Sequence, residues 1–370
     1  MISDNTQKIK LGVIFGGAST EYEISCASCA SMLDNTDIQK YDIYKIGILK
    51  DGRWFMYTGP NEKIIDLSWE KDTANLVPAI LSPCSAHHGI MTLNKAEKKY
   101  EILKLDCVFP VLHGANGEDG VMQGLLKLSG IPFVGSRTRG AAITMDKAVT
   151  KSITEKYGIR QAKWFSFKCS EFRQCSDEIM DKLEKEFSYP VFVKPCNAGS
   201  SVGVTKVKSK SAFPDAVSAA AAVDDKVIVE ESVKGREIEV AVLETHEKGK
   251  QKIIVSRCGE IIPNNEFYDY EAKYISNGSK LIIPASLDKN VEENARDTAK
   301  RIFNLTDCAG LARVDFFADE NGVIFNEINA IPGFTKISMY PKLFENAGIE
   351  YKKLIDMLIA EAVYSARSDE

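Results

Sequence analysis

Short apolar runs alternate with amphipathic or polar stretches along most of the chain, which predicts strands and helices in succession. The first run, LGVIFGG (11–17), reads as a strand that ends in two glycines, and a helical pattern follows to about residue 33. A strand, a glycine-rich turn and a helix begin a doubly wound α/β unit. The predicted α/β domain, residues 1–140, continues with YDIYKIGI, RWFMYTG, a polar hairpin-bearing insertion to about residue 99, DCVFPVL (106–112) and GIPFVGS (130–136).

The remaining pattern predicts two further domains, so the expected fold class is α/β and α+β. Residues 141–232 read as a helix from MDKAVTKSITEKYGI, strands VFVKP (191–195), SVGVTKV (201–207) and VIVEE (227–231), and a helix near 215–222. Residues 233–370 read as the alternating strand REIEVAVLE, a helix (292–304), the hairpin ARVDFFADENGVIFNEIN and a terminal amphipathic helix around YKKLIDMLIAEAV. Apolar residues at helical spacing predict that this last helix packs on a core.

Length and charge narrow the classes of function. A chain of 370 residues exceeds one compact core and has room for two or three domains. The formal net charge of −5 comes without a basic stripe, so nucleic acid is not an expected partner. No apolar run approaches the ~20 residues that span a bilayer, and MISDNTQKIK lacks the apolar region of a signal peptide. We therefore expect a cytoplasmic protein without a membrane partner.

The nine cysteines are odd in number and scattered, which does not suggest a disulfide framework. Cys26 and Cys29 form a C-x-x-C pair that is compatible with a metal or redox site. The chain has no second such pair, however, and these two fall in a predicted helix, where buried cysteines commonly pack as small apolar residues.

Oxygen ligands gather in the predicted C-terminal hairpin. The turn signal ADENG (318–322) pairs the runs on either side as antiparallel strands, which brings Asp315 towards Glu327. Asn329 lies two residues after Glu327 and points to the same side. Two carboxylates and an amide oxygen suit Mg²⁺ or Mn²⁺ beside a nucleotide, and the alternative is a solvated strand face. Arg313 shares this face and can neutralise a phosphate or a developing oxyanion.

A second set of residues suits phosphate. In AGSSVGV (198–204), small residues let backbone N–H groups approach an anion and two serine hydroxyls can donate, although a simple Gly-Ser turn explains the run equally well. Lys194, in the apolar strand VFVKP, needs an anion partner or a route to solvent. Lys147 can be a further phosphate ligand or a solvated helical lysine. Glu237, at a predicted domain boundary, can accept hydrogen bonds from ribose hydroxyls.

Four groups of motifs occur in order: GGASTEYEIS, HGANGEDGVMQG, VKPCNAGSSVGVTKV, and RVDFF followed by NEINAIPGFT and SMYPKL. From about residue 10 to about residue 360, the sequence resembles the D-alanine–D-alanine ligases of the ATP-grasp superfamily. The resemblance implies a three-domain ATP-grasp architecture: an N-terminal doubly wound α/β domain (1–140), a central ATP-grasp domain (141–232) and a C-terminal catalytic ATP-grasp domain (233–370). It also implies ATP, a pair of Mg²⁺ or Mn²⁺ ions, a homodimer and a role in peptidoglycan synthesis.

The resemblance further implies a two-step reaction. The carboxylate of a first D-alanine attacks the γ-phosphate of ATP, and the amine of a second D-amino acid then displaces phosphate from the acyl phosphate. The resemblance implies that Arg313 and the backbone N–H of Gly333 stabilise the oxyanion of the tetrahedral intermediate in the second step. The implied metal ligands are Asp315, Glu327 and Asn329, and the implied nucleotide ligands are Lys147, Lys194, Ser201, Glu230, Glu231, Val233 and Glu237.

For the first D-alanine, the resemblance implies that Glu21 anchors the ammonium group in a hydrogen-bonded trio with Ser200 and Tyr274. His113 and Glu118, in HGANGEDG, match a second patch near that substrate. His113 is expected to position groups there rather than to act as an essential base, and a purely structural role is the alternative.

Two positions bear on the second substrate. Lys273 and Tyr274 match the Lys-Tyr of dipeptide ligases, and Ser338 with Met339 matches the segment that binds the second carboxylate, so D-alanine is predicted. The alternatives are D-serine or D-lactate, because the N-terminal half resembles the D-serine branch equally and Ala330 stands where threonine is usual. A non-catalytic nucleotide-binding regulatory protein is the alternative from another class.

Overall fold

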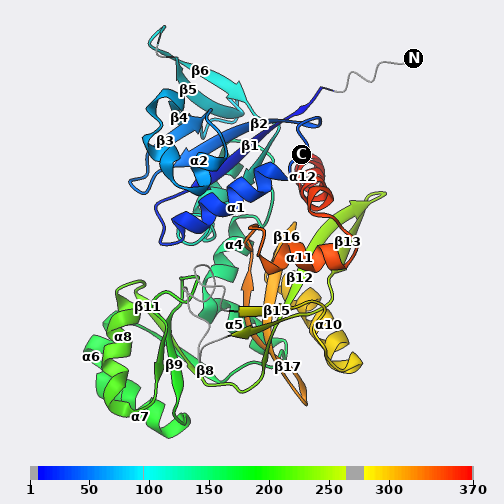
Figure 1. Cartoon of the computed structure of the whole chain (residues 1–370). Coiled ribbons are helices and arrows are strands. Elements are labelled where there is room, and N and C mark those ends of the chain that lie inside the picture. Colours follow the sequence, from blue (N-terminus) through cyan, green and yellow to red (C-terminus); the bar gives the residue numbers. More distant parts are fainter. Residues whose placement is uncertain (1–6, 95, 264–278, 369–370) are drawn as a thin grey trace.

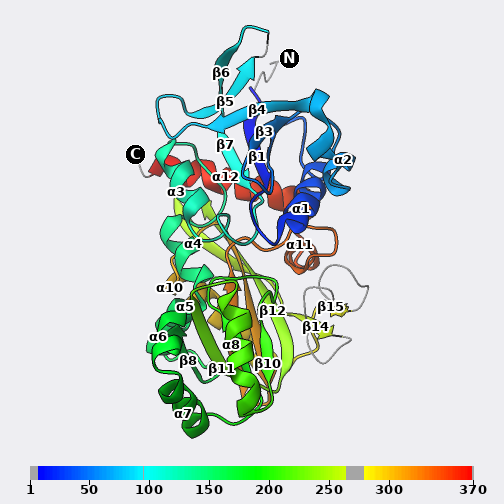
Figure 2. The same cartoon turned by 90° about the vertical axis from the view of Figure 1, so that its left-hand side faces the viewer.

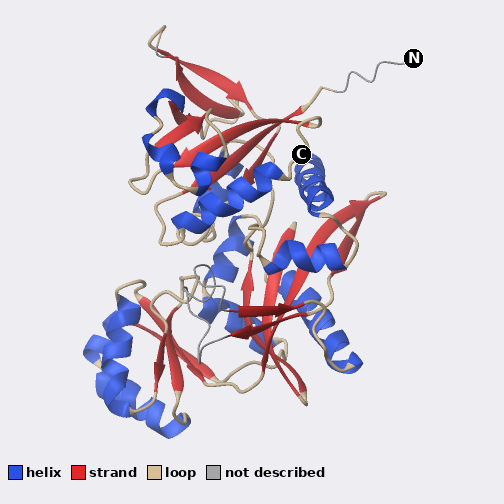
Figure 3. Ribbon diagram, viewed as in Figure 1, coloured by secondary structure: helices blue, strands red, loops and turns tan. Residues whose placement is uncertain are grey.

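The computed structural model describes residues 7–94, 96–263 and 279–368, which form three β-sheets flanked by helices. Figure 1 shows the first sheet at one end of the molecule and the other two side by side at the opposite end. Figure 3 separates the helices from the strands in the same view. No helix in this described part of the chain has the length and apolar character needed to cross a bilayer.

The first sheet has seven strands in the order β6-β5-β4-β3-β2-β1-β7. Its parallel centre consists of β1 (Ile9–Gly16), β2 (Tyr41–Ile48) and β7 (Cys107–Pro110). Antiparallel pairing extends it through β3 (Trp54–Tyr57), β4 (Leu76–Leu81), β5 (Gly89–Asn94) and β6 (Lys99–Lys104). The predicted insertion therefore extends the sheet itself and ends in the β5–β6 hairpin.

Helices connect and cover these strands. They are α1 (Tyr22–Asp34), α2 (Glu62–Ile65), the 3₁₀ turns η1 (Ser68–Lys71) and η2 (Thr73–Asn75), and α3 (Val121–Leu128). The prediction of a strand over 130–136 is wrong, because this segment forms only one bridge, between Phe133 and Val108. Phe133 and its apolar neighbours are buried, so the run packs on the core without becoming a sheet member.

The second sheet is antiparallel, with the order β10-β9-β11-β8. Its strands are β8 (Trp164–Lys168), β9 (Val191–Pro195), β10 (Thr205–Val207) and β11 (Lys226–Glu231). Its helices are α6 (Cys169–Gln174), α7 (Ser176–Glu186), η3 (Lys210–Ala212) and α8 (Phe213–Ala221). They lie on the face turned away from the third sheet (Figure 1). Two helices, α4 (Thr138–Met145) and α5 (Lys147–Lys156), lead from the first sheet to this lobe.

The third sheet is also antiparallel and has the order β15-β14-β12-β16-β17, with β13 paired to β12. Its strands are β12 (Arg236–Glu247), β13 (Lys250–Val255), β14 (Gly259–Pro263), β15 (Ser279–Ile282), β16 (Leu311–Asp319) and β17 (Gly322–Asn329). The helix predicted at 292–304 is α10 (Lys289–Leu305), and it packs on this sheet.

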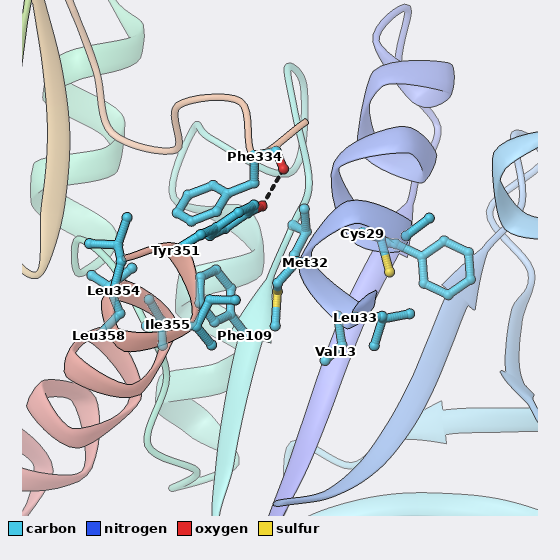
Figure 4. Packing of buried hydrophobic residues seen from close by; sticks show 14 of the residues in the cluster. Val13, Cys29, Met32, Leu33, Phe109, Phe334, Tyr351, Leu354, Ile355 and Leu358 are labelled. Atoms are coloured by element: carbon cyan, nitrogen blue, oxygen red, sulfur yellow. Dashed lines mark hydrogen bonds between the residues drawn. The ribbon is translucent and has the colours of Figure 1, made fainter. Parts of the chain in front are cut away.

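The last two helices, α11 (Met339–Asn346) and α12 (Tyr351–Ser368), join the third sheet to the first. One buried cluster contains residues of β1, α1 and β7 together with residues of β12, α11 and α12. Figure 2 shows α12 running beneath the first sheet, and Figure 4 shows its Leu354, Ile355 and Leu358 beside Phe109 of β7. The C-terminal helix therefore ties the two ends of the molecule together.

Candidate active site

A cleft of about 1390 Å³, counting its open mouth, lies between the second and third sheets. Strands β9 and β11 form one wall, and β12, β16 and β17 form the other. Most of the residues predicted for nucleotide or metal binding line this single cleft: Lys147, Lys194, Ser201, Glu230, Glu231, Val233, Glu237, Asp315 and Glu327. Ser200, predicted to contact Glu21, lines it as well. Residues separated by up to 180 positions in the sequence are thus brought to one place.

The β16–β17 hairpin brings the predicted metal ligands together. Its register pairs Asp315 with Glu327 and Arg313 with Asn329, which confirms the predicted pairing of the two strands. The amide of Asn329 donates a hydrogen bond to Asp315 over 3.1 Å. Asp315 and Glu327 line the cleft, whereas Asn329 does not appear in the cleft wall and reaches this group through its hydrogen bond to Asp315.

Arg313 lies against these oxygens. Its guanidinium donates to both carboxylate oxygens of Asp315, over 2.8 and 2.7 Å, and pairs with Glu239 at 3.1 Å. Glu239 is buried, lines the cleft and faces Asp315 across β12 and β16. It is not among the predicted residues. The sequence could have indicated Glu239, because it lies two residues after Glu237 on an alternating strand and such residues share a face.

Lys147 reaches the cleft from the first turn of α5. Asp146 caps this helix by accepting hydrogen bonds from two backbone N–H groups of the first turn, which sets the direction in which Lys147 leaves. The ammonium group of Lys147 donates to the carbonyl of Ala198 over 2.7 Å and lies 3.4 Å from Glu327. One lysine therefore links α5, the serine-rich loop and the β16–β17 hairpin.

The serine-rich loop is a tight left-handed turn. Ser200, Ser201 and Gly203 all have positive φ, at 49°, 59° and 73°. The predicted strand over 201–207 is therefore shortened to β10, because this backbone cannot extend until Thr205. A Cβ on Gly199 would lie 2.6 Å from a carboxylate oxygen of Glu21, so a larger residue there would have to displace that carboxylate.

Glu230 and Lys194 meet at the floor of the cleft. Lys194, on β9, lies 2.5 Å from one carboxylate oxygen of Glu230, and Lys151 of α5 lies 2.7 Å from the other. Burial opposes ionisation of Glu230, but the two ammonium groups outweigh it and lower the pKa of this carboxyl to about 2. Lys151 is not among the predicted residues; its place one helical turn after Lys147 was the available signal.

Glu231, the last residue of β11, lies at the edge of the cleft. Glu231 accepts a hydrogen bond from the backbone N–H of Lys163 over 2.7 Å, and its own N–H donates to the Lys163 carbonyl over 3.0 Å. The side chain of Glu231 is therefore engaged at the cleft edge, and Val233 and Glu237 line the cleft beyond it.

A second group of predicted residues forms a corner between the first sheet and the cleft. The hydroxyl of Ser200 donates to the buried carboxylate of Glu21, so the two described members of the predicted trio are in contact. Glu118 accepts a hydrogen bond from the backbone N–H of Gly114 over 2.8 Å. Burial, reinforced by the nearby Glu21 carboxylate, raises the pKa of Glu118 to about 8.

His113 is buried in this corner, and burial lowers its pKa to about 4. A neutral imidazole near pH 7 fits the expected positioning role. The hydroxyl of Ser28, on α1, lies 3.2 Å from Nε2 of His113 and also accepts a hydrogen bond from the backbone N–H of Phe334 over 3.2 Å. Ser28 therefore links His113 to the segment that carries Gly333.

Gly333 precedes Phe334 in the loop between β17 and α11. A Cβ on Gly333 would lie 2.8 Å from the hydroxyl of Ser338, so the loop is closely packed there. Ser338 contacts Thr335 through its hydroxyl, 3.0 Å from the backbone nitrogen and 2.7 Å from the side-chain hydroxyl. The side chain of Met339 is buried in the core. Lys273 and Tyr274 lie outside the described residues.

Both halves of the chain match family models. Residues 10–136 match the model described as D-ala D-ala ligase N-terminus, and residues 153–360 match D-ala D-ala ligase C-terminus. The chain is 47% identical over 362 residues to a D-alanine–D-alanine ligase from Caldicellulosiruptor bescii, covering 97% of this chain and 96% of the relative. It is 48% identical over 366 residues to one from Acetivibrio thermocellus, covering 96% of each.

The solved structures similar to this chain belong to the same family, and one of them is named for a different second substrate, D-serine. The fold matches the VanG D-Ala:D-Ser ligase from Enterococcus faecalis with a TM-score of 0.85 and 40% identity, covering 96% of this chain and 100% of that one. It matches the D-alanine–D-alanine ligase from Coxiella burnetii with a TM-score of 0.81 and 33% identity, covering 98% and 96%. The mixed α/β architecture with three sheets is that of these ATP-grasp ligases.

Proposed function

This chain belongs to the D-alanine–D-alanine ligase family, and from that premise we propose that it joins two D-alanine molecules into D-alanyl-D-alanine at the expense of ATP. The product serves peptidoglycan precursor synthesis. The observation that carries the proposal is the convergence of phosphate-type cations and hard oxygen donors, Lys147, Lys194, Asp315 and Glu327, on one cleft. The family implies ATP and a divalent metal ion.

The donor set fits that metal. Asp315, Glu327 and the amide of Asn329 are oxygen donors in one hairpin, and such donors prefer Mg²⁺ or Mn²⁺ to zinc. We propose that these three residues hold a pair of Mg²⁺ or Mn²⁺ ions. When bound there, the ions would neutralise charge on the phosphates of ATP.

The remaining cleft residues position the nucleotide. Lys147 and Lys194 can each bind a phosphate oxygen, and Ser201 with the backbone of the loop can donate to others. Glu230, Glu231 and Val233 form the hinge against which the adenine is proposed to lie, and Glu237 can accept from the ribose hydroxyls. Phosphoryl transfer depends mainly on such positioning and charge neutralisation.

In the first step, a carboxylate oxygen of D-alanine attacks the γ-phosphorus, the bond to the β-phosphate oxygen breaks, and ADP leaves. Glu21, which accepts a hydrogen bond from Ser200, is proposed to anchor the ammonium group of this substrate. Tyr274, the third member of the predicted trio, lies outside the described residues. His113 and Glu118 complete the same corner. These interactions act by orientation, which holds the attacking oxygen near its target.

In the second step, the amine of the second D-alanine attacks the acyl carbon, phosphate leaves and the amine loses its proton. The negative charge that develops on the carbonyl oxygen is proposed to be stabilised by Arg313 and the backbone N–H of Gly333. Ser338 and the Met339 segment are proposed to bind the second carboxylate, together with Lys273, which lies outside the described residues.

One observation favours a second candidate product. A solved relative at 40% identity is a D-Ala:D-Ser ligase, while the sequence relatives at 47% and 48% are D-alanine–D-alanine ligases. We propose D-alanine as the second substrate, with D-serine or D-lactate as the alternative. A non-catalytic nucleotide-binding protein is the alternative from another class, and retention of both the cationic and the acidic set argues against it.

A competition assay tests the proposal. ATP, Mg²⁺, D-alanine and equal D-serine and D-lactate are incubated with the protein, and the products are identified by mass. D-alanyl-D-alanine is the expected main product, and a dominant mixed product would overturn the choice of substrate. If folded protein with Mg²⁺ releases no phosphate in response to D-alanine, the proposed ligase activity is refuted.

The wider organisation remains a prediction. The division at residues 1–140, 141–232 and 233–370 is supported by the three sheets, whose strands fall within these ranges. A homodimer is expected for this family and can be measured by analytical ultracentrifugation.

A further inference from the structure

A buried lysine, Lys151, lies next to Lys147 and Lys194, the two lysines proposed to bind phosphate in the cleft. Lys151 is on α5, one turn after Lys147, and only 2% of its side chain is exposed. Lys147 lines the cleft, whereas Lys151 does not appear in its described lining. A buried ammonium group is costly unless it is paired, so its partner indicates what it does.

The partner of Lys151 is Glu230, which is shared with Lys194. One carboxylate oxygen of Glu230 lies 2.7 Å from the Lys151 nitrogen, and the other lies 2.5 Å from the Lys194 nitrogen. Lys194 is the more accessible of the two lysines, with 17% of its side chain exposed, and it lines the cleft. The three groups are therefore arranged as a buried cation, a buried anion and a cation at the surface of the cleft.

This arrangement has a net charge of +1, and its distribution matters for phosphate binding. With Lys151 present, Glu230 keeps one ammonium partner even when Lys194 turns towards an anion. Without Lys151, Lys194 would be the remaining cation paired with Glu230. A buried carboxylate left unpaired is strongly unfavourable, so the Glu230–Lys194 pair would be hard to separate. Lys194 would then be held by Glu230 and would attract phosphate less.

We propose that Lys151 is a positioning residue: it is the fixed counter-ion of Glu230 and thereby leaves Lys194 free to bind the phosphates of the nucleotide. The inference rests on the proposed function in one respect, namely that nucleotide phosphates occupy the cleft beside Lys194. Lys151 acts through Glu230 and does not touch the substrate.

A purely structural role for Lys151 makes a different prediction. The lysine also ties α5 to β11 and lies 5.9 Å from the centre of the Phe325 ring, so its loss could loosen the whole cleft. A loosened cleft would bind the nucleoside and the nucleotide equally poorly. The proposed role concerns only the phosphates, which makes adenosine the informative comparison with ADP.

The test is Lys151→Met, which keeps the length and apolar volume of the side chain and removes its charge. Dissociation constants are measured for ADP by calorimetry and for adenosine by competition against ADP. We expect ADP to bind about 10- to 100-fold more weakly, the range for one hydrogen bond to a charged group, and adenosine to change less than about twofold. Lys156→Met, an exposed site on the same helix, is the matched control and should leave both constants unchanged.

A double variant keeps the test decisive if Lys151→Met is poorly folded. In Lys151→Met/Glu230→Gln the uncompensated buried carboxylate is gone and Lys194 is released. The ratio of the adenosine constant to the ADP constant should therefore return towards the wild-type ratio. An unchanged ADP constant in Lys151→Met, an equal loss for adenosine, or no recovery in the double variant would each overturn the inference.

These measurements are independent of turnover. ADP binding requires no D-alanine, so a protein that binds ADP but releases no phosphate in response to D-alanine would refute the proposed ligase activity and not the role of Lys151. Conversely, an active ligase whose ADP constant is insensitive to Lys151→Met would refute the role of Lys151 alone.

Discussion

Phe334 anchors the loop that carries Gly333, so its truncation should affect stability and activity together. The side chain is fully buried and its ring centre lies 5.6 Å from that of Phe109, 5.6 Å from that of Tyr340 and 6.0 Å from that of Tyr351. Its backbone N–H donates to Ser28 and its carbonyl accepts from the Tyr351 hydroxyl, as Figure 4 shows for the latter bond.

The expected magnitude follows from this burial. Phe→Ala changes in well-packed cores cost about 3–5 kcal/mol, and three aromatic neighbours place Phe334→Ala towards the upper end. The catalytic effect arises because the cavity lets Gly333 move. A shift of about 1 Å in a positioning group can cost about 100-fold in rate, so we expect kcat to fall by that order.

The assay compares Phe334→Ala with Phe213→Ala. Phe213 is equally buried, but it lies in the core of the second sheet and contacts Phe172. Urea unfolding should show similar losses of unfolding free energy for both variants, and D-alanine-dependent phosphate release is then measured at low temperature, where both are folded. The reasoning is refuted if Phe334→Ala keeps a normal kcat, or if Phe213→Ala loses as much as Phe334→Ala.

Three further predictions follow from the site. Glu327→Gln should lower phosphate release at least about 100-fold, because it would weaken the site of a metal ion that supplies several kcal/mol of charge stabilisation when bound. Glu320→Gln, at the exposed turn of the same hairpin, should be near normal. Near-normal phosphate release by Glu327→Gln would exclude the metal assignment. The folded protein holds a proton on Glu118 up to about pH 8, whereas the unfolded chain releases it near pH 4.5. The free energy of unfolding should therefore fall as the pH rises from 4.5 to 8, and it should fall more in wild type than in Glu118→Gln. Parallel pH curves for the two proteins would contradict this. Ser28→Ala leaves the backbone N–H of Phe334 without its acceptor. The free energy of unfolding in urea should fall by about 1–3 kcal/mol, and kcat should fall as well. An unchanged kcat would show that Ser28 does not position the Gly333 loop.

Local signals in the sequence were sufficient for much of the fold. The ADENG turn and the alternation around it predicted the β16–β17 hairpin, and the register pairs Asp315 with Glu327 as expected. The helix predicted at 292–304 is observed at Lys289–Leu305, and the first strand, its glycine turn and the following helix are all present. Such elements are predictable because strand alternation, helical periodicity and turn residues act within a few positions of each other.

The wrong strand predictions fell on apolar runs that can be buried in more than one conformation. The segment around Phe133 looks like a strand, but it packs on the first sheet through a single bridge. The run 201–207 was predicted as a strand, and positive φ at Ser201 and Gly203 restricts extension to β10. In both segments the surroundings decide which conformation buries the apolar side chains and satisfies the backbone, and periodicity alone cannot distinguish them.

By itself, the sequence determined most of the order of elements, the family and most of the polar residues that line the cleft, because motifs and periodicity are local properties of the chain. Only the tertiary structure decided that α12 packs beneath the first sheet, that Phe334 is held by Ser28 and Tyr351, and that Lys151 pairs with Glu230. These contacts join residues far apart in sequence, and their energies come from burial and charge pairing that exist only in the assembled fold.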